Sequence, residues 1–346
     1  MTVRIYSTPV RSFEELGADW RALEAEVPGR SFFQSWSWVG CLAEERYPDP
    51  VLLRAEAEGR TLGLALFNRR QGRLCLAESG DAALDAPFIE HNAPLSLGDD
   101  IRRGLLRAAW GVAGARRLVL SGVAPEVLHA AGGTALRLQA RPAPLVDLGA
   151  VRTAGGDYLA TRSANTRYQL RRSARFYAAG GEVLLQRAAD AAEALDWFDA
   201  LLRLHESTWR ERGGAGAFAT PFLQRFHRSL IAQGASRGEV DMLRVTAGEQ
   251  EVGYLYNLRL AGRVFAYQSG LDHAGAGTHG KPGLTCHAMA VQRALEMGDA
   301  IYDFLAGADQ YKRSLATGSE PMVWAELLPV WSPLGMAARL RRLVLR

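Results

Sequence analysis

The spacing of apolar residues in the first half of the chain predicts helices that alternate with short strands. Phe13, Leu16 and Trp20 recur at helical intervals, and the runs that flank residues 58–60 alternate as in a β-hairpin. The predicted elements of this half are a helix over 13–26, an aromatic-rich segment over 31–39, strands over 51–57, 61–68 and 73–78, a helix over 101–112 and a strand over 117–121. Because proline lacks a backbone donor, the stretch 141–144 predicts a linker or the start of an edge strand, and we place a domain boundary near residue 150.

The second half repeats this order with clearer signals. Its predicted elements are a basic helix over 164–179, a strand over 182–186, helices over 191–212 and 221–233, strands over 240–247, 252–260 and 264–271, a helix over 284–297 and a strand over 301–305. Short turns join the three strands before residue 271, which favours antiparallel pairing. The strand, helix and strand that end at residue 305 instead predict a right-handed crossover and one parallel pair. The predicted fold class is α/β in the α+β sense, with mixed, mostly antiparallel sheets flanked by helices.

Composition narrows the class of protein. A length of 346 residues suggests two domains, and 48% hydrophobic with 23% charged residues excludes collagen-like and disordered chains. The net charge of +4 does not require a nucleic-acid partner but is compatible with anionic ligands. Cys41, Cys75 and Cys286 stand far apart, which fits neither a disulfide framework nor a zinc knuckle. With no signal-peptide pattern and no membrane-span pattern, we expect a cytoplasmic protein.

The glycine-rich loop 272–283 is the first candidate for chemistry. It precedes the crossover helix, whose first amide groups are unpaired and carry partial positive charge, so this helix start predicts an anion site. Lys281 adds charge, and Pro282 suits a first helical turn. The glycines that allow close approach of an oxyanion are Gly275, Gly277, Gly280 and Gly283. The loop matches neither the P-loop nor the dinucleotide-binding signature, and a flexible surface loop is the alternative.

Several motifs, taken together, resemble the GNAT acyltransferases. They are Phe33-Gln-Ser-Trp-Ser-Trp38, Ser163-Ala-Asn-Thr-Arg-Tyr-Gln-Leu-Arg-Arg172, His205-Glu-Ser-Thr-Trp-Arg-Glu-Arg-Gly213, Gly253-Tyr-Leu-Tyr256, Tyr267-Gln-Ser-Gly-Leu-Asp272, Gly298-Asp-Ala-Ile-Tyr-Asp-Phe-Leu-Ala-Gly307 and Tyr311-Lys312. Their order and spacing carry the resemblance, which is strong over about 160–315 and weaker before it. The second half is most similar to the BioF2-like group, which includes the CelD/BcsL proteins and is related to the FemAB-type peptidyltransferases with two GNAT-like domains. The phosphate loop common in GNAT proteins is shorter and reads Gln or Arg followed by Gly-x-Gly, so the amides that hold phosphate are left open here.

The resemblance implies two tandem GNAT-like domains. A degenerate N-terminal domain is expected over 1–150 and a catalytic domain with a splayed parallel strand pair over 151–346. The implied reaction is transfer of an acyl group, in the simplest case acetyl, from acyl-CoA to an amine of a small molecule or saccharide precursor, by direct attack in a ternary complex. The residues expected to bind the cofactor along the strand, loop and helix start are Ser269, Gly270, Gly275, Gly277, Gly280, Lys281, Gly283 and Leu284.

The resemblance also points to residues around the acceptor. His205 lies on the long helix that borders the acceptor pocket in this fold, and Tyr311 follows the last core strand, where many GNAT enzymes place a tyrosine that protonates the departing thiolate. Asp272 and Asp303 stand at the ends of the splayed strands and complete the catalytic candidates. The acceptor-binding candidates are Asn165, Arg167, Arg171, Glu206, Trp209, Tyr256, Tyr267 and Lys312. Core packing, a solvated charged face or a structural histidine is the alternative for each.

Two other functions stay open from the sequence. A FemAB-like transferase would take aminoacyl-tRNA as donor and would need a longer basic surface. A catalytically inactive GNAT-like module would serve only in binding. The histidines lack metal-ligand spacing, so we predict no metal, and we expect no DNA partner. The basic amphipathic segment 336–346 predicts a closing helix or, alternatively, weak association with an anionic membrane surface.

Overall fold

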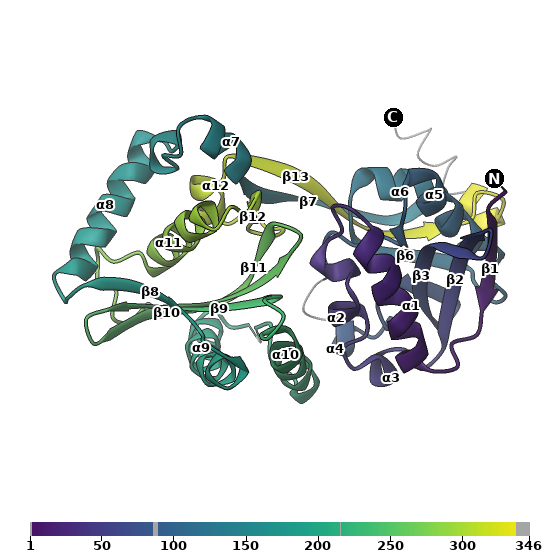
Figure 1. The fold of residues 1–346 in the computed structure, drawn as a ribbon, viewed down its shortest axis with the longest axis horizontal. Coiled ribbons are helices and arrows are strands. Elements are labelled where there is room, and N and C mark those ends of the chain that lie inside the picture. Colours follow the sequence, from purple (N-terminus) through teal and green to yellow (C-terminus); the bar gives the residue numbers. More distant parts are fainter. Residues whose placement is uncertain (1, 86–88, 215, 337–346) are drawn as a thin grey trace. The chain divides into compact units, whose positions relative to one another are not determined.

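The computed structural model describes residues 2–85, 89–214 and 216–336, and the chain divides into two compact units (Figure 1). The first unit contains Met1–Arg141 and Pro321–Arg346, and the second contains Pro142–Glu320, so strands β7 (Thr134–Asp147) and β13 (Gly318–Leu328) have residues in both units. The chain thus leaves the first unit before the boundary predicted near residue 150 and returns to it after Glu320. The segment 336–346, predicted as a closing helix, lies outside the described residues from position 337 onward. Within the described ranges, we find no helix whose length and apolar character would suit a bilayer crossing.

The first unit is built on a sheet with the strand order β1-β2-β3-β4-β6-β13, with β5 paired to β3. Every neighbouring pair is antiparallel except β4 and β6, which are parallel. Its elements are β1 (Arg4–Thr8), α1 (Phe13–Glu26), η1 (Phe32–Gln34), α2 (Trp36–Val39), α3 (Ala43–Arg46), β2 (Pro50–Ala57), β3 (Arg60–Arg70), β4 (Arg73–Leu76), α4 (Ala82–Asp85), β5 (Leu95–Ser96), α5 (Asp99–Ala108), η2 (Ala109–Gly111), β6 (Arg117–Val123), α6 (Pro125–Ala131) and β13 (Gly318–Leu328). The main core of this unit lies between the sheet and the helices α5 and α6.

The second unit has the strand order β7-β12-β11-β10-β9-β8. Among its described strands, β11 and β12 are parallel and the other neighbouring pairs are antiparallel. Its elements are β7 (Thr134–Asp147), α7 (Leu148–Thr153), η3 (Leu159–Thr161), α8 (Ala164–Ala178), β8 (Val183–Arg187), α9 (Ala191–Glu211), α10 (Pro221–Gly234), β9 (Val240–Ala247), β10 (Gln250–Leu260), β11 (Arg263–Leu271), α11 (Pro282–Glu296), β12 (Ile301–Asp303) and α12 (Gln310–Leu315). Figure 1 shows α8 and α11 on one face of this sheet and α9 and α10 on the other.

The two units share one plan, which confirms the predicted class of mixed sheets flanked by helices. In each unit the last of four antiparallel strands pairs in parallel with a fifth strand, β4 with β6 and β11 with β12. A helix lies in the connection between the two parallel strands, α5 in the first unit and α11 in the second. Because two parallel strands need a crossover connection, this helix is set by the topology.

Local sequence explains where three of the predicted helices begin. Ser163, Asp190 and Thr220 each accept a hydrogen bond from a backbone N–H in the first turn of α8, α9 and α10. The stretch 141–144, predicted as a linker or the start of an edge strand, lies within strand β7. Its prolines are tolerated because their carbonyls are the groups used: Pro144 accepts from Phe304 N at 2.9 Å, and Pro142 accepts from Gly307 N at 2.9 Å.

Candidate functional site

The strands β11 and β12 pair over only three residues and then part. Their register runs from Arg263 opposite Ile301 to Phe265 opposite Asp303, after which β12 ends. Strand β11 continues to Leu271, and among the described strands it pairs there with β10 alone. The predicted splayed parallel pair is therefore present, and residues 266–271 of β11 have one edge that β12 does not cover.

The alternation of strand hydrogen bonds fixes which groups face this uncovered edge. Asp272 N donates to Val252 O at 3.1 Å, so the backbone groups of Asp272 and Gly270 face β10, and those of Leu271 and Ser269 face the gap. The Leu271 carbonyl accepts from His273 N at 3.1 Å. The Ser269 carbonyl faces His205 Nδ1 at 3.1 Å. The Ser269 N–H is thus a donor directed into the gap.

The start of α11 offers two further donors. Pro282 is the first helical residue, and the N–H groups of Gly283 and Leu284 that follow it have no acceptor among the described residues. Lys281 N is held by Ser173 Oγ of α8 at 2.9 Å, while the Lys281 side chain is exposed. The helix start therefore combines open amides, the positive end of the helix dipole and a lysine, as the sequence predicted.

The glycines of the preceding loop shape its turns. Gly275 N donates to Asp272 Oδ1 at 2.9 Å, and Gly280 N donates to Ala276 O at 2.8 Å. A Cβ on Gly280 would collide with the Ala276 carbonyl, and Gly277 has a φ of +51°. The amides of Gly275 and Gly280 are therefore engaged within the loop, which corrects the expectation that they face a phosphate.

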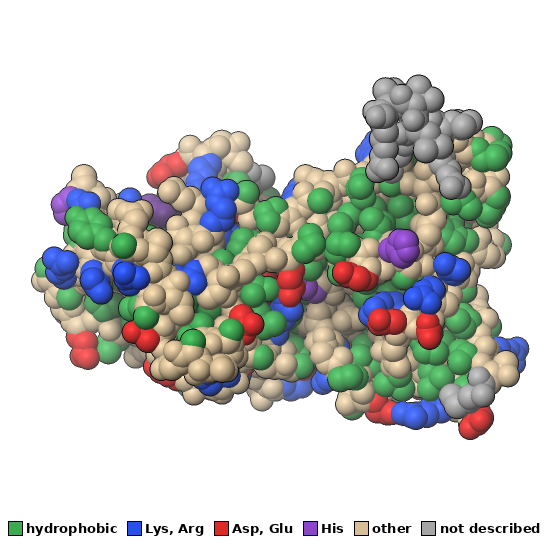
Figure 2. Space-filling view, turned by 90° about the horizontal axis from the view of Figure 1, so that it is seen from above, with side chains coloured by type: hydrophobic (Ala, Val, Ile, Leu, Met, Phe, Trp, Pro, Cys, Tyr) green, Lys and Arg blue, Asp and Glu red, His purple; other side chains and the backbone are tan. Residues whose placement is uncertain are grey.

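Helix α8 lies beside this loop with a row of arginines. Arg167, Arg171, Arg172 and Arg175 form no ion pair with any residue the structure describes, and the helix contains no acid. Arg172 contacts His279 of the loop through its guanidinium. Figure 2 shows basic side chains gathered at this end of the second unit. The sequence pattern did not single out Ser173 of α8, which is fully buried and whose Oγ lies 2.8 Å from Thr285 Oγ1. Its position on the buried face of α8 is the feature of the sequence that could have indicated it.

His205 is 5% exposed and has both ring nitrogens engaged. Besides its contact with Ser269, it receives the backbone N–H of Ala217 at Nε2, at 3.1 Å. Burial lowers its pKa below the ordinary value, partly offset by the bond to Ser269. A general base needs a free lone pair, so this arrangement does not favour the catalytic role that the sequence suggested.

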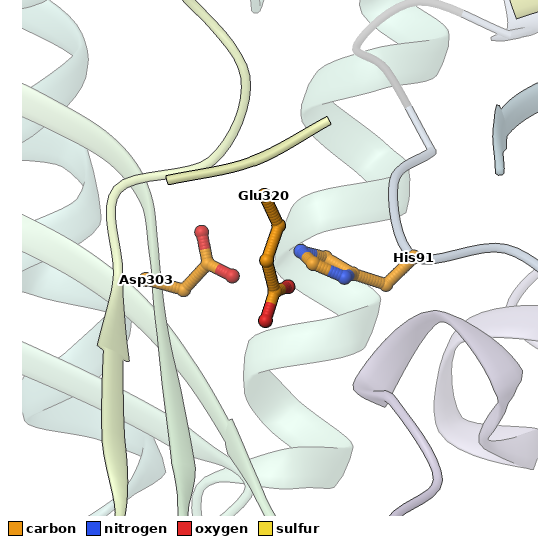
Figure 3. A group of neighbouring side chains, drawn as sticks. All are labelled: His91, Asp303 and Glu320. Atoms are coloured by element: carbon orange, nitrogen blue, oxygen red, sulfur yellow. The ribbon is translucent and has the colours of Figure 1, made fainter. Parts of the chain in front are cut away.

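Asp303 lies at the point where the strands part, but its carboxylate is fixed by an arginine. Arg263 Nη2 lies 2.5 Å from Asp303 Oδ2 and 2.8 Å from Glu320 Oε2, and Leu305 N donates to Asp303 Oδ1 at 2.7 Å. Figure 3 shows the side chains of Asp303 and Glu320 next to each other. Asp303 is completely buried, so this ion pair is a structural lock at the end of β12 and leaves little scope for proton transfer.

Tyr311 and Lys312 lie on α12, directly after β12. The Tyr311 ring stacks on the buried His287 of α11, with centroids 5.2 Å apart, and burial raises the Tyr311 pKa. His287 Nδ1 lies 3.2 Å from Tyr302 Oη, and burial lowers the His287 pKa to about 3. Lys312 Nζ donates to Ala306 O at 3.0 Å and supports the turn between β12 and α12. Tyr311 therefore remains a protonated phenol near the parting strands.

The remaining acceptor candidates separate into buried and exposed residues. Tyr256 and Tyr267 pack with His227 in the core between the sheet and α10, which favours packing over contact with an acceptor. Trp209 is 36% exposed near the end of α9, and Glu206 is exposed on the same helix. Asn165 is exposed in the first turn of α8. Trp209 and Glu206 are thus the acceptor candidates on α9 with accessible side chains.

The equivalent gap of the first unit is filled by its own chain. Strands β4 and β6 also pair over three residues, yet Asn92 bridges them: its Nδ2 donates to Leu76 O at 3.0 Å and its N to Gly122 O at 3.0 Å. Helix α5 begins with Asp99 and Asp100. Acids at a helix start oppose a phosphate, so the first unit lacks the features that distinguish the second.

Two carboxyl groups lie close to this filled gap. Glu78 follows β4 and is 9% exposed; burial first and the Asp85 carboxylate second raise its pKa to about 8, against the opposing effects of Ser121 and Arg46. Asp85 accepts hydrogen bonds from Ser79 N and Gly80 N, both at 2.7 Å. Glu78 is therefore the member of the pair that keeps its proton near neutral pH.

Comparison with known proteins agrees with this geometry. Residues 164–313 match the family model described as an acetyltransferase (GNAT) domain. The solved structure of FemX has a TM-score of 0.58 with 10% identity and covers 92% of this chain and 96% of that chain. L-PGS from Bacillus licheniformis has a TM-score of 0.54 with 13% identity, over 94% and 95% of the two chains. A conserved protein from Bacteroides thetaiotaomicron has a TM-score of 0.55 with 11% identity, over 90% and 97%.

At such identities these structures establish the fold and nothing finer. A comparison with curated proteins gave no match. The family model covers the segment that contains α8, the parting strands, the loop and α11, which are the features that carried the resemblance in the sequence. Residues 164–313 therefore match an acetyltransferase (GNAT) domain, and the chain as a whole has a two-unit fold similar to that of FemX.

Proposed function

We propose that this protein is an acyl-CoA-dependent N-acyltransferase that acylates an amine of a small molecule or saccharide precursor. One observation carries the proposal: the uncovered edge of β11 leads into a helix start where Gly283 N, Leu284 N and Lys281 are open to an anion. An extended thioester with a diphosphate at its far end needs this succession of a strand edge and an anion site.

The proposed binding mode assigns each part of the cofactor to a group of this chain. The diphosphate lies on the first turn of α11, and the pantetheine arm follows the gap-facing edge of β11. The thioester carbonyl accepts from the Ser269 N–H, which polarises it and stabilises the negative charge that develops on attack. The unpaired arginines of α8, Arg172 foremost because it touches the loop, attract the 3′-phosphate.

The chemistry then requires little more than orientation and proton transfer. The neutral acceptor amine attacks the thioester carbonyl, the C–N bond forms, and the C–S bond breaks as the thiolate leaves. The attacking nitrogen gives up one proton to solvent as the amide forms. Tyr311, whose pKa is raised by burial, is protonated, donates its hydroxyl proton to the thiolate and regains a proton from solvent. Trp209 and Glu206 are the residues we assign to the acceptor side.

A cytoplasmic location fits this proposal. Cys41, Cys75 and Cys286 are buried and form no disulfide among the described residues, as in proteins of a reducing compartment.

Binding of acetyl-CoA, measured by isothermal titration calorimetry, tests the proposed site. Lys281→Glu reverses a charge beside the open amides, and we expect at least about a tenfold loss of affinity. Arg116→Glu, an exposed charge reversal in the first unit, is the matched control and should change the affinity little. Equal affinities of the wild type and Lys281→Glu would remove the phosphate cradle from the proposal.

The arginine row of α8 supports a second candidate, in which aminoacyl-tRNA is the donor. Arg167, Arg171 and Arg175 are four residues apart, so they follow one face of the helix at a rise of about 6 Å per step. Binding of tRNA that weakens steeply with salt, together with turnover of charged tRNA but not of acetyl-CoA, would favour this candidate. A protein that binds acetyl-CoA but acylates no amine in a broad panel would instead be an inactive binding module.

A further inference from the structure

The two hydrogen bonds of His205 fix its tautomer. A carbonyl oxygen can only accept, so the Nδ1 atom that faces Ser269 O at 3.1 Å carries the hydrogen. The backbone N–H of Ala217 can only donate, so Nε2, at 3.1 Å, carries the lone pair. His205 is thus a neutral ring that joins strand β11 to the segment between α9 and α10.

Residues 216–218 of this segment pack around His205. The segment runs from the end of α9 at Glu211 to the start of α10 at Pro221 and contains several glycines. Gly216 has a φ of +70°, and a Cβ at this position would lie 2.9 Å from His205 Nε2 and 3.1 Å from Trp209 Cδ1. Phe218 packs edge-on against the His205 ring, with centroids 5.1 Å apart. Gly216 and Phe218 therefore pack closely against the His205 imidazole.

The same ring changes what the edge of β11 offers to a ligand. A residue at an uncovered strand edge presents both its N–H and its C=O, so Ser269 would place an acceptor beside its donor. The bond from His205 Nδ1 occupies that acceptor and leaves the Ser269 N–H directed into the gap. A thioester carbonyl oxygen needs a donor and is repelled by a neighbouring carbonyl oxygen.

We infer that His205 is a positioning residue of the acyl-transfer site, which holds the α9–α10 segment against β11 and makes the edge at Ser269 a donor for the thioester carbonyl. This inference rests on the proposed function for its second half. The first half, the anchoring of the segment, stands on the two hydrogen bonds and the packing alone.

Two variants separate the two bonds. In His205→Asn the side-chain amide stands near the position of Nδ1, so the bond to Ser269 is kept and the bond to Ala217 is lost. In His205→Phe the packing against Phe218 is kept and both bonds are lost. His129→Phe, on the exposed side of α6 in the first unit, is the matched control.

Steady-state acyl transfer gives the first readout. We expect His205→Asn to raise KM for the acceptor amine several-fold while kcat stays within about threefold of the wild type. We expect His205→Phe to lower kcat as well, by about tenfold or more, because the Ser269 carbonyl is exposed to the thioester. Both variants should keep the shape of the pH profile of kcat/KM, since the neutral ring supplies no proton-transfer step.

Limited trypsin digestion gives a readout independent of activity. Arg210 and Arg212 adjoin the anchored segment, so both variants should be cleaved there several-fold faster than the wild type and the control. Loss of the acidic limb of the pH profile in both variants, with unchanged cleavage, would overturn the inference and restore His205 as a general base. If the wild type binds no acetyl-CoA, the proposed function fails, whereas unchanged cleavage alone refutes the anchoring.

Discussion

Replacing Glu78 by Gln should remove a pH-dependent loss of stability from the first unit. Glu78 is buried at the end of β4, next to Asp85, and burial is the main reason why its pKa rises from 4.5 to about 8. Gln has nearly the same shape and no charge at any pH. The variant therefore isolates the titration of this one group from its packing.

The sign and size of this pH-dependent change in the free energy of unfolding follow from the Glu78 proton, which the folded chain keeps and the unfolded chain releases. Between pH 4.5 and about 8 the unfolded chain has released the Glu78 proton and the folded chain has not, so the free energy of unfolding falls as the pH rises. The contribution of Glu78 to the free energy of unfolding is fully present below its pKa in the unfolded chain, and it is lost as the pH rises through its pKa in the folded chain. Each pH unit is worth about 1.4 kcal/mol, which gives a ceiling of about 4 kcal/mol between pH 5 and pH 8. Because water penetration reduces the penalty of burial, we expect about 2 kcal/mol.

Urea unfolding followed by tryptophan fluorescence measures this effect in the first unit, where Trp20, Trp36 and Trp38 are buried. We expect Glu78→Gln and the wild type to be similar at pH 5, and the variant to be more stable at pH 8. Glu44→Gln, an exposed acid of α3, is the control and should follow the wild type at both pH values. If the wild type and Glu78→Gln lose stability in parallel between pH 5 and pH 8, Glu78 is ionised in the folded state and the reasoning is refuted.

Three further substitutions test the packing around the two gaps. Gly270→Ala places a Cβ against the Leu201 carbonyl and should cost about 1–3 kcal/mol of unfolding free energy, with weaker acetyl-CoA binding as α9 shifts. Asn92→Ala leaves a buried carbonyl without its donor and should cost about 1–3 kcal/mol in thermal unfolding while acetyl-CoA affinity is unchanged. Asp303→Asn should cost about 2–3 kcal/mol by urea unfolding, because Arg263 keeps Glu320 but loses its buried partner; an unchanged midpoint would contradict the ion-pair lock.

The local sequence determined most elements of the second unit. The helices predicted over 164–179, 191–212 and 221–233 end within one residue of α8, α9 and α10, because capping residues and apolar periodicity act within a few positions of the chain. The crossover from β11 through α11 to β12 was also readable, since a strand, helix and strand in succession leave few topologies open.

The part of the proposed site that could be predicted from the sequence is the part formed by neighbouring residues of the chain. Lys281, Gly283 and Leu284 belong to a helix start, which a sequence displays directly. The bonding partners of His205 and Asp303 could not be predicted from the sequence, because they lie on other elements. These partners are Ala217 and Ser269 for His205, and Arg263 for Asp303.

The sequence by itself therefore determined most helices and the crossover, and it predicted the helix start at which we propose that an anion binds. The tertiary structure decided which unit keeps an open gap: Asn92 and the acids of α5 occupy the gap of the first unit, whereas the edge of β11 stays uncovered. It also decided that the β7 stretch with two prolines is a strand and that the chain returns to the first unit after Glu320. The physical reason is that hydrogen bonds between distant strands and ion pairs across elements depend on register and burial, which no window of sequence contains.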